Sequence, residues 1–179
     1  MSEARFPTSL DARRAELDQT RTRLLEVISA AAANSGTAPA RPGQWSTAEI
    51  IYHLHLSERS IVRLLAKALA SSERHEPADE TRLRAEWERI RRLVAVRGSK
   101  VRAPEFVAPI HAPDSGAALD LLKQSRAALL ELVARTAYDD LLRISRPHPF
   151  EVVGVLTGAG WLSLVAAHEE RHTQQIEAR

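Results

Sequence analysis

Apolar residues recur every three or four positions along several long segments of this chain, and no other feature constrains its fold as strongly. Such spacing places an apolar face along one side of an α-helix. The pattern covers residues 10–33, 46–70, 79–96, 115–136 and 157–176. Aromatic residues make up only 4% of the chain, while Ala and Leu are abundant, which suits helix-on-helix packing better than a β-sandwich. We therefore expect an all-α four-helix bundle with an additional shorter helix.

Capping and helix-breaking residues predict where these helices begin and end. Ser46 followed three residues later by Glu49 is a capping box, which predicts a helix start. Trp45 precedes the cap and is placed to pack against Ile50 or a neighbouring helix. The first helix should stop at Asn34–Gly36, and the helix over 79–96 should end at Gly98. The last helix should begin near Thr157, or as early as Glu151 if its glycines are tolerated.

Proline-containing segments separate the predicted helices. Pro39 and Pro42 predict a loop after the first helix, and Arg146–Phe150 is interpreted as a rigid connector. Val101–Pro113 contains three prolines and cannot be a helix interior. We expect this long loop to cross the end of the bundle, since such loops are often functional. The length predicts one domain over residues 1–179, with its core over about 8–177.

Charge and composition argue against several classes of function. Acidic and basic residues are interleaved and the net charge is only +2, whereas a nucleic-acid interface needs a one-sided basic face. Arginines spaced like those between positions 82 and 97 more often lie on the solvent-exposed face of a helix than in a nucleic-acid interface. No apolar run approaches the ~20 residues of a membrane span, and no hydrophobic signal region is present. Zero cysteines exclude disulfides, thiolate catalysis and cysteine metal ligands. We expect a cytoplasmic protein with no membrane or nucleic-acid partner.

Two histidines near the C-terminus stand four residues apart, at His168 and His172. On a helix both imidazoles project from the same face, so one metal ion could bind both. The competing interpretation is that two histidines occur four residues apart by chance on a solvent-exposed helix and bind no metal. The pair continues an apolar stripe through Leu164 and Trp161, however, which should face the core. Buried imidazoles need partners for their ring nitrogens, and a metal ion would supply one for both.

The third ligand that such a pair requires is predicted to be His53. It lies on an apolar stripe with Ile50, Leu54 and Ile61, whereas His55 points about 200° away and is expected at the surface or an interface. Taken alone, His53 is more readily interpreted as a core histidine hydrogen-bonded to a backbone carbonyl, and the C-terminal pair shifts the interpretation toward the metal. Three histidines from two helices would leave coordination positions open for water and substrate, as in catalytic sites.

Two sequence blocks resemble the DinB-like superfamily, a group of bacterial four-helix-bundle proteins regarded as metalloenzymes. Residues 44–54 (Gln-Trp-Ser-Thr-Ala-Glu-Ile-Ile-Tyr-His-Leu) are similar to the start of the family's second helix. Residues 148–175, with His-Pro, Gly-Val-Leu-Thr, Trp and His-x-x-x-His-x-x-Gln, are similar to its C-terminal block. The segment His148–Gly154 departs from the family's simple His-Pro-x-Phe-Gly turn, so the loop into the last helix is expected to differ in shape.

The resemblance implies a specific metal site and class of chemistry. His53, His168 and His172 would be the metal triad, and the ion a divalent transition metal such as nickel or zinc, between which imidazole ligands cannot choose. Some members of the superfamily are thiol-dependent S-transferases or isomerases that use bacillithiol or mycothiol. Homodimers are common, so the resemblance implies that this chain forms a homodimer. The family name does not imply DNA binding.

Four further polar residues lie near these motifs. Glu49 could act as a second-shell base, although the capping box already accounts for it. Gln175 could orient His172 as a second-shell partner or cap the helix end. Glu169 points about 100° from His168 and is expected in solvent. His148, between two prolines, is a weaker ligand candidate.

Two functions from different classes are the main candidates at this point, and the interleaved charges argue against a third, a nucleic-acid-associated damage-response protein. The first is a metal-dependent enzyme, a thiol-dependent S-transferase or a metal-assisted hydrolase acting on a small molecule. Three neutral imidazoles would leave the charge of the ion unneutralised, so it would depress the pKa of a bound water or thiol. Without a cysteine of its own, the protein would need a low-molecular-weight thiol for thiol chemistry. The alternative is a non-catalytic small-molecule-binding or stress-associated interaction module with a vestigial site.

Overall fold

A computed structural model describes residues 5–34, 43–95 and 102–178, and it is mostly helical. The helices are α1 (Leu10–Asn34), α2 (Thr47–Ala70), α3 (Glu80–Ile90), α4 (Ser115–Ala134), α5 (Tyr138–Arg143) and α6 (Gly158–Glu177). A π-helical turn (Arg91–Ala95) continues α3, and two 3-10 turns, η2 (Glu105–Val107) and η3 (Glu151–Val153), lie in the loops. Strands β1 (Ser145–Pro147) and β2 (Val155–Thr157) pair antiparallel, with Arg146 opposite Leu156.

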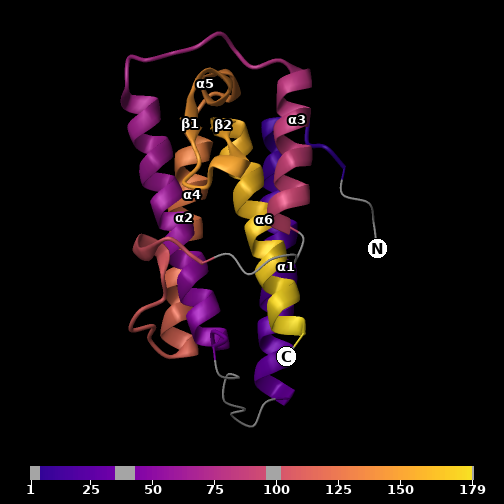
Figure 1. Ribbon diagram of the computed structural model, residues 1–179, viewed down its shortest axis with the longest axis vertical. Coiled ribbons are helices and arrows are strands. Elements are labelled where there is room, and N and C mark those ends of the chain that lie inside the picture. Colours follow the sequence, from indigo (N-terminus) through magenta and orange to yellow (C-terminus); the bar gives the residue numbers. More distant parts are fainter. Residues whose placement is uncertain (1–4, 35–42, 96–101, 179) are drawn as a thin grey trace.

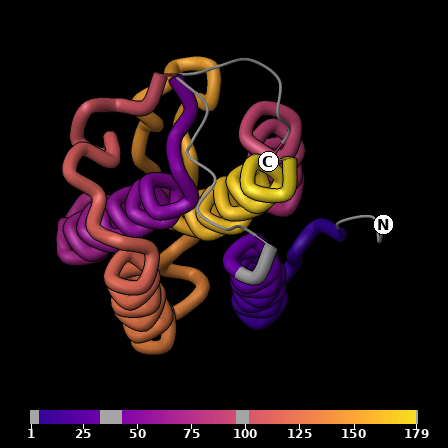
Figure 2. The backbone as a smooth tube through the Cα atoms, turned by 90° about the horizontal axis from the view of Figure 1, so that it is seen from below, coloured from indigo at the N-terminus to yellow at the C-terminus, as the bar shows by residue number. Residues whose placement is uncertain are grey.

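Helices α1, α2, α4 and α6 form a four-helix bundle, as the sequence predicts. Helix α1 packs mainly against α6, and α2 packs mainly against α4. Helices α1 and α6 run in one direction along the long axis while α2 and α4 run in the other (Figure 1). Helix α3 lies outside these four helices and packs against α6. In the view along the bundle, it lies beside α6, to one side of the other helices (Figure 2). Helix α6 therefore has neighbours on several sides.

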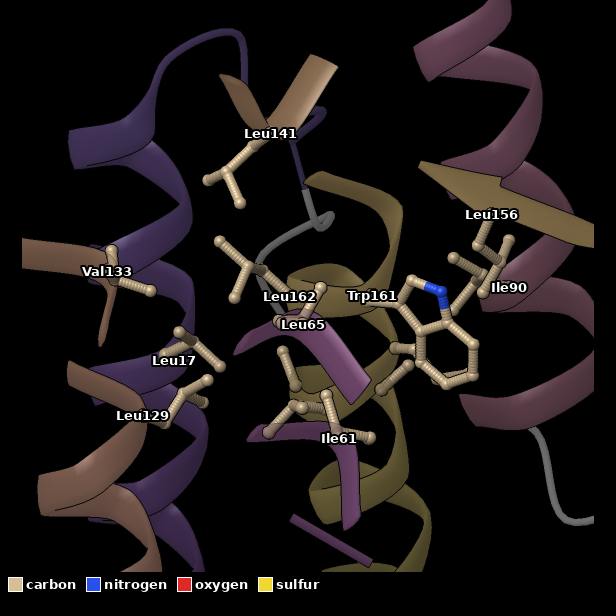
Figure 3. Close-up of a cluster of buried hydrophobic side chains, with 14 of the residues drawn as sticks. Leu17, Ile61, Leu65, Ile90, Leu129, Val133, Leu141, Leu156, Trp161 and Leu162 are labelled. Carbon is tan, nitrogen blue, oxygen red and sulfur yellow. The ribbon is translucent and has the colours of Figure 1, made fainter. Parts of the chain in front are cut away.

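An apolar core fills the half of the bundle that lies nearer α5. Figure 3 shows how side chains from every element of this region meet around Trp161 and Leu162 of α6. Ile61 and Leu65 come from α2, and Leu17 comes from α1. A second cluster, around Leu24, Ile50 and Leu122, fills the other half. No helix in the described ranges is both long and apolar enough to cross a membrane.

Between these two clusters, each helix of the bundle contributes one buried charged residue. Arg21 of α1 donates from Nε to Glu169 of α6 at 2.7 Å, and Arg126 of α4 donates from Nε to Glu58 of α2 at 2.6 Å. Arg126 also lies 3.1 Å from Glu169, and Arg21 lies 3.4 Å from Glu58. Two cations and two anions thus compensate one another, which buried charges require. We call these four residues the charge cluster.

The structure corrects two predictions about side chains of this region. Glu169 was expected in solvent, yet only 2% of it is exposed, because α6 turns that face toward α1 and α4, where the two arginines meet it. His55 was expected at the surface or an interface, yet only 6% of it is exposed. Its ring stacks near Tyr52, and the side of α2 that carries it is covered by α4.

The connections differ from prediction more than the helices do. Arg146–Phe150 is not a simple rigid connector, since its first residues belong to the β1–β2 hairpin. Helix α6 begins at Gly158 with Thr157 as its N-cap, which confirms the predicted start near Thr157 and not the alternative at Glu151. The short helix α5 was not predicted. The predicted stop at Asn34–Gly36, the prolines at 39 and 42 and the predicted helix end at Gly98 fall wholly or partly outside the described residues.

Candidate metal centre

The capping box at the start of α2 sets the position of His53. Ser46 accepts a hydrogen bond from the backbone N–H of Glu49 at 3.2 Å, and the Glu49 carboxylate accepts one from the backbone N–H of Ser46 at 2.6 Å. Both halves of the predicted capping box are therefore present. This start places His53 in the second turn of α2, with its ring directed toward α6. The carboxylate of Glu49 is used by the cap.

A second cap, built from two elements, fixes the start of α6. Thr157 accepts a hydrogen bond from the backbone N–H of Gly160 at 2.9 Å. The buried carboxylate of Glu86, from α3, accepts hydrogen bonds from the Thr157 backbone N–H at 3.0 Å and from its hydroxyl at 2.8 Å. A negative charge at a helix N-terminus is favourable because it meets the positive end of the helix dipole. Helix α6 runs without a break from this cap to His168 and His172.

The three predicted histidines meet at one point between α2 and α6. The Nε2 atom of His168 lies 3.2 Å from Nε2 of His53 and 3.1 Å from Nε2 of His172. One ring nitrogen from each histidine lies within 4.8 Å of the other two. His53 and His172 are buried, and His168 is partly buried.

The opposite ring nitrogens of two of these histidines show which nitrogen carries the proton. His53 Nδ1 donates to the backbone carbonyl of Val107 at 2.7 Å, and His172 Nδ1 donates to Gln175 Oε1 at 2.8 Å. Since both acceptors are oxygens without hydrogens, both Nδ1 atoms are protonated and both Nε2 atoms present lone pairs. His168 Nε2 carries at most one hydrogen, so it cannot satisfy both neighbours. A cation at the centre would satisfy all three.

The spacing of the nitrogens also fits a metal ion. Two nitrogens bound at about 2.0–2.1 Å to one tetrahedral ion lie about 3.3 Å apart, close to the two observed separations. Imidazole is a ligand for zinc and nickel alike. A three-histidine set without a carboxylate leaves coordination positions available. The residues present therefore fit a divalent transition metal.

The surroundings favour neutral imidazoles, which are the form that binds metal. Burial lowers the pKa of His53. Burial also holds the pKa of His168 well below its usual range, and the neighbouring His172 and His53 lower it further. The indole of Trp45 lies against the His53 ring, with a centroid separation of 4.7 Å, and is stacked near the His172 ring at 6.3 Å. Trp45 thus forms a wall of the site, in addition to its predicted packing near the helix start.

Two other residues near the predicted motifs lie away from the three nitrogens. His148 stacks on Trp161, with ring centroids 5.6 Å apart, and its Nδ1 accepts a hydrogen bond from the backbone N–H of Phe150. His55 is buried on another side of α2 and does not join the group. Gln175, by contrast, lies where an orienting partner of His172 must be.

Sequence reasoning missed two contributors to the site. The carbonyl of Val107 comes from η2 in the proline-containing loop, and η2 packs against α2. A backbone carbonyl partner for His53 was one of the expected alternatives, but no side-chain pattern could identify the carbonyl of Val107, although the prolines of this loop marked it as unusual. The charge cluster lies beside the site, and its carboxylates come from residues next to or near the histidines in sequence. The sequence pattern that could have predicted the charge cluster is one charged residue at an inward-facing position of each of the four bundle helices.

Comparison with known proteins agrees with this architecture. A family model described as the DinB superfamily matches residues 16–176. Among solved structures, the chain is similar to one described as TT2238, a four-helix bundle protein, with 24% identity and a TM-score of 0.51. That alignment covers 96% of this chain and 99% of the other, and at this identity it shows the fold alone. A search of curated proteins gave no match. Since the family model spans the segment from α1 to α6, the chain belongs to the DinB superfamily.

Proposed function

We propose that this protein binds one divalent transition metal, nickel or zinc, through His53, His168 and His172, and is a metal-dependent enzyme acting on a small molecule. The observation that carries the proposal is the convergence of three Nε2 atoms, two of which are fixed as lone-pair donors by Val107 and Gln175. Buried lone pairs that face one another repel unless a cation or a hydrogen-bond donor lies between them, and a single ion can satisfy all three nitrogens at once.

An ion held by three neutral imidazoles would keep its full positive charge and supply Lewis-acid chemistry to a ligand in an open position. The residues of the chain would have narrower roles. Val107 and Gln175 would hold the rings of His53 and His172 in orientation, as partners of metal-binding histidines do elsewhere. Trp45 would exclude water from one side of the site. These roles suit transfer or hydrolysis at an electrophilic centre.

The chain contains no cysteine, so a thiol used in the reaction would have to come from a separate small molecule. A low-molecular-weight thiol is the natural candidate for transfer chemistry, because an open metal position favours the thiolate form of a ligand. Membership of the DinB superfamily supports this proposal. A protein that binds a small molecule without turning it over is the competing function.

The first experiment measures metal content in protein purified without nickel affinity chromatography. We expect about one divalent metal per chain in the wild type, and loss of that metal in His168→Ala. His75→Ala is the matched control, because His75 is exposed and lies outside the three-histidine group. Equal metal content in the two variants would overturn the assignment of the site.

The second experiment tests for turnover. Metal-loaded wild type and His168→Ala are assayed with several low-molecular-weight thiols and an electrophilic acceptor. We expect thiol-dependent turnover by the wild type that disappears on chelation and returns when metal is restored. Stoichiometric metal binding without turnover under every condition would favour the binding module over the enzyme.

A further inference from the structure

A small cavity of about 10 Å³ lies between α2 and α6, directly beside the three-histidine site. Its wall contains four residues with polar side chains, namely Ser57, Glu58, His168 and Glu169. The remaining wall is apolar and includes Ile61 and Val165. This volume corresponds to about one water molecule, and a buried water requires two to four polar partners. The cavity meets both conditions, and it is far too small for a substrate.

Two of the polar groups at this cavity have no partner among the residues that the structure describes. His168 directs Nε2 toward His53 and His172, so its Nδ1 lies on the other edge of the ring. Among the described residues, none accepts a hydrogen bond from this Nδ1. In those same ranges, none forms a hydrogen bond with the Ser57 hydroxyl. The other two histidines of the site each have an oxygen acceptor at Nδ1.

The carboxylates at the cavity are held in place by the charge cluster. Glu58 accepts hydrogen bonds from Arg126 at Oε1 and from Ser125 at Oε2, at 2.6 and 2.7 Å. Glu169 accepts hydrogen bonds from Arg21 and from Thr20, at 2.7 and 2.9 Å. A carboxylate oxygen has two lone pairs, and Oε1 of Glu58 receives a single hydrogen bond. It can therefore accept another hydrogen bond from a molecule in the cavity.

We propose that this cavity is a binding site for one structural water that accepts a hydrogen bond from His168 Nδ1 and donates one to Glu58. The Ser57 hydroxyl is the third partner of this water. Ser57 and Glu58 are then positioning residues for His168, in the way that Val107 and Gln175 position the other two histidines. The inference rests on the proposed metal site, because it assigns to His168 an orienting partner that the described residues do not supply directly.

The water would couple the metal site to the charge cluster. By accepting from Nδ1, it keeps the proton of His168 on that nitrogen and leaves the Nε2 lone pair for the metal. By donating to a carboxylate that two side chains hold rigid, it fixes the plane of the ring. Every histidine of the site would then have an oxygen partner behind it.

The test compares Ser57→Val, which fills the cavity with a methyl group and removes the hydroxyl, with Ser57→Thr, which keeps the hydroxyl. Ser60→Val is the matched control, since it makes the same change on the same helix at a residue that does not line the cavity. Binding of Zn²⁺ is measured by calorimetry, and a high-resolution crystal structure of the zinc-loaded wild type locates ordered water. Far-ultraviolet circular dichroism and thermal unfolding of the metal-free proteins check that each variant folds.

We expect a water within hydrogen-bonding distance of His168 Nδ1 and Glu58, and a Zn²⁺ affinity about tenfold to a hundredfold lower in Ser57→Val. Ser57→Thr should bind more tightly than Ser57→Val, and Ser60→Val should match the wild type. Wild-type binding together with equal affinities for Ser57→Val and Ser60→Val, or a dry cavity, would overturn this inference and leave the proposed function intact. A wild type that binds no Zn²⁺ would overturn the proposed function itself, and this inference with it.

Discussion

Replacing Gly160 by Ala should destabilise the protein strongly, although Ala is normally the better helix residue. A Cβ added at Gly160 would lie 2.3 Å from Glu86 Oε2, whereas ordinary van der Waals contacts begin at 3.4 Å. The carboxylate cannot move away freely, since this same oxygen accepts both hydrogen bonds from Thr157. The cap that starts α6 must therefore break or shift when Ala is introduced.

The size of the effect follows from those two hydrogen bonds. Each hydrogen bond to a charged group contributes about 1.5–3 kcal/mol, while Ala gains about 1 kcal/mol over Gly in a helix. With partial relaxation, Gly160→Ala should lower the free energy of unfolding by about 2–4 kcal/mol. For a chain of this size, the melting temperature should fall by roughly 5–15 °C.

Urea unfolding followed by circular dichroism measures this change, with Gly116→Ala as the control. Gly116 also lies in the first turn of a helix, but a Cβ there meets only Asp114 Oδ1, at 3.2 Å, and its substitution should alter stability by less than about 1 kcal/mol. In a Glu86→Ala background the obstacle is gone, so Gly160→Ala should be neutral or stabilising. The same loss in both backgrounds would refute the reasoning.

Three further predictions concern the metal site and a partly buried carboxyl group. His172→Ala should abolish stoichiometric Zn²⁺ binding in a calorimetric titration while His75→Ala retains it, and binding by His172→Ala would show that the third ligand is wrongly assigned. Gln175→Ala should weaken Zn²⁺ binding by about tenfold because His172 loses the acceptor at Nδ1. An unchanged affinity would mean that Gln175 only caps the helix end and does not orient His172. Burial raises the pKa of Glu16, so its contribution to stability is present below the unfolded-state pKa of about 4.3 and is lost as the pH rises through the folded-state value. Glu16→Gln should therefore gain stability relative to wild type as the pH rises from about 4 to 7, and the opposite trend in melting temperatures would contradict the direction of the shift.

The four bundle helices could be predicted from the sequence because each is long enough to show its period. The start of α2 was also predictable, since Ser46 and Glu49 form a cap from local contacts alone. Helix α5 has only six residues and each strand only three, which is too short for a periodic pattern. The hairpin depends instead on pairing between residues that flank η3.

The errors at His55 and Glu169 have a common physical cause. Assigning one apolar stripe to each helix assumes that each helix has one buried side. Helix α2 packs against both α4 and α6, and α6 packs against α1, α2 and α3. The burial of Glu169 further depends on Arg21 and Arg126, which come from two other helices. Such long-range compensation is invisible in the sequence of one helix.

The charge cluster has a consequence for how this sequence can change over generations. Losing any one of Arg21, Glu58, Arg126 and Glu169 leaves an uncompensated charge in the interior, which typically costs about 3–5 kcal/mol. That is a large share of the roughly 5–15 kcal/mol by which folded domains are stable. An apolar replacement of all four could be tolerated, but it requires several simultaneous substitutions. We therefore expect these four positions to covary among homologous sequences. A homologue that lacks one of the two arginines should also lack one of the two carboxylates on another helix.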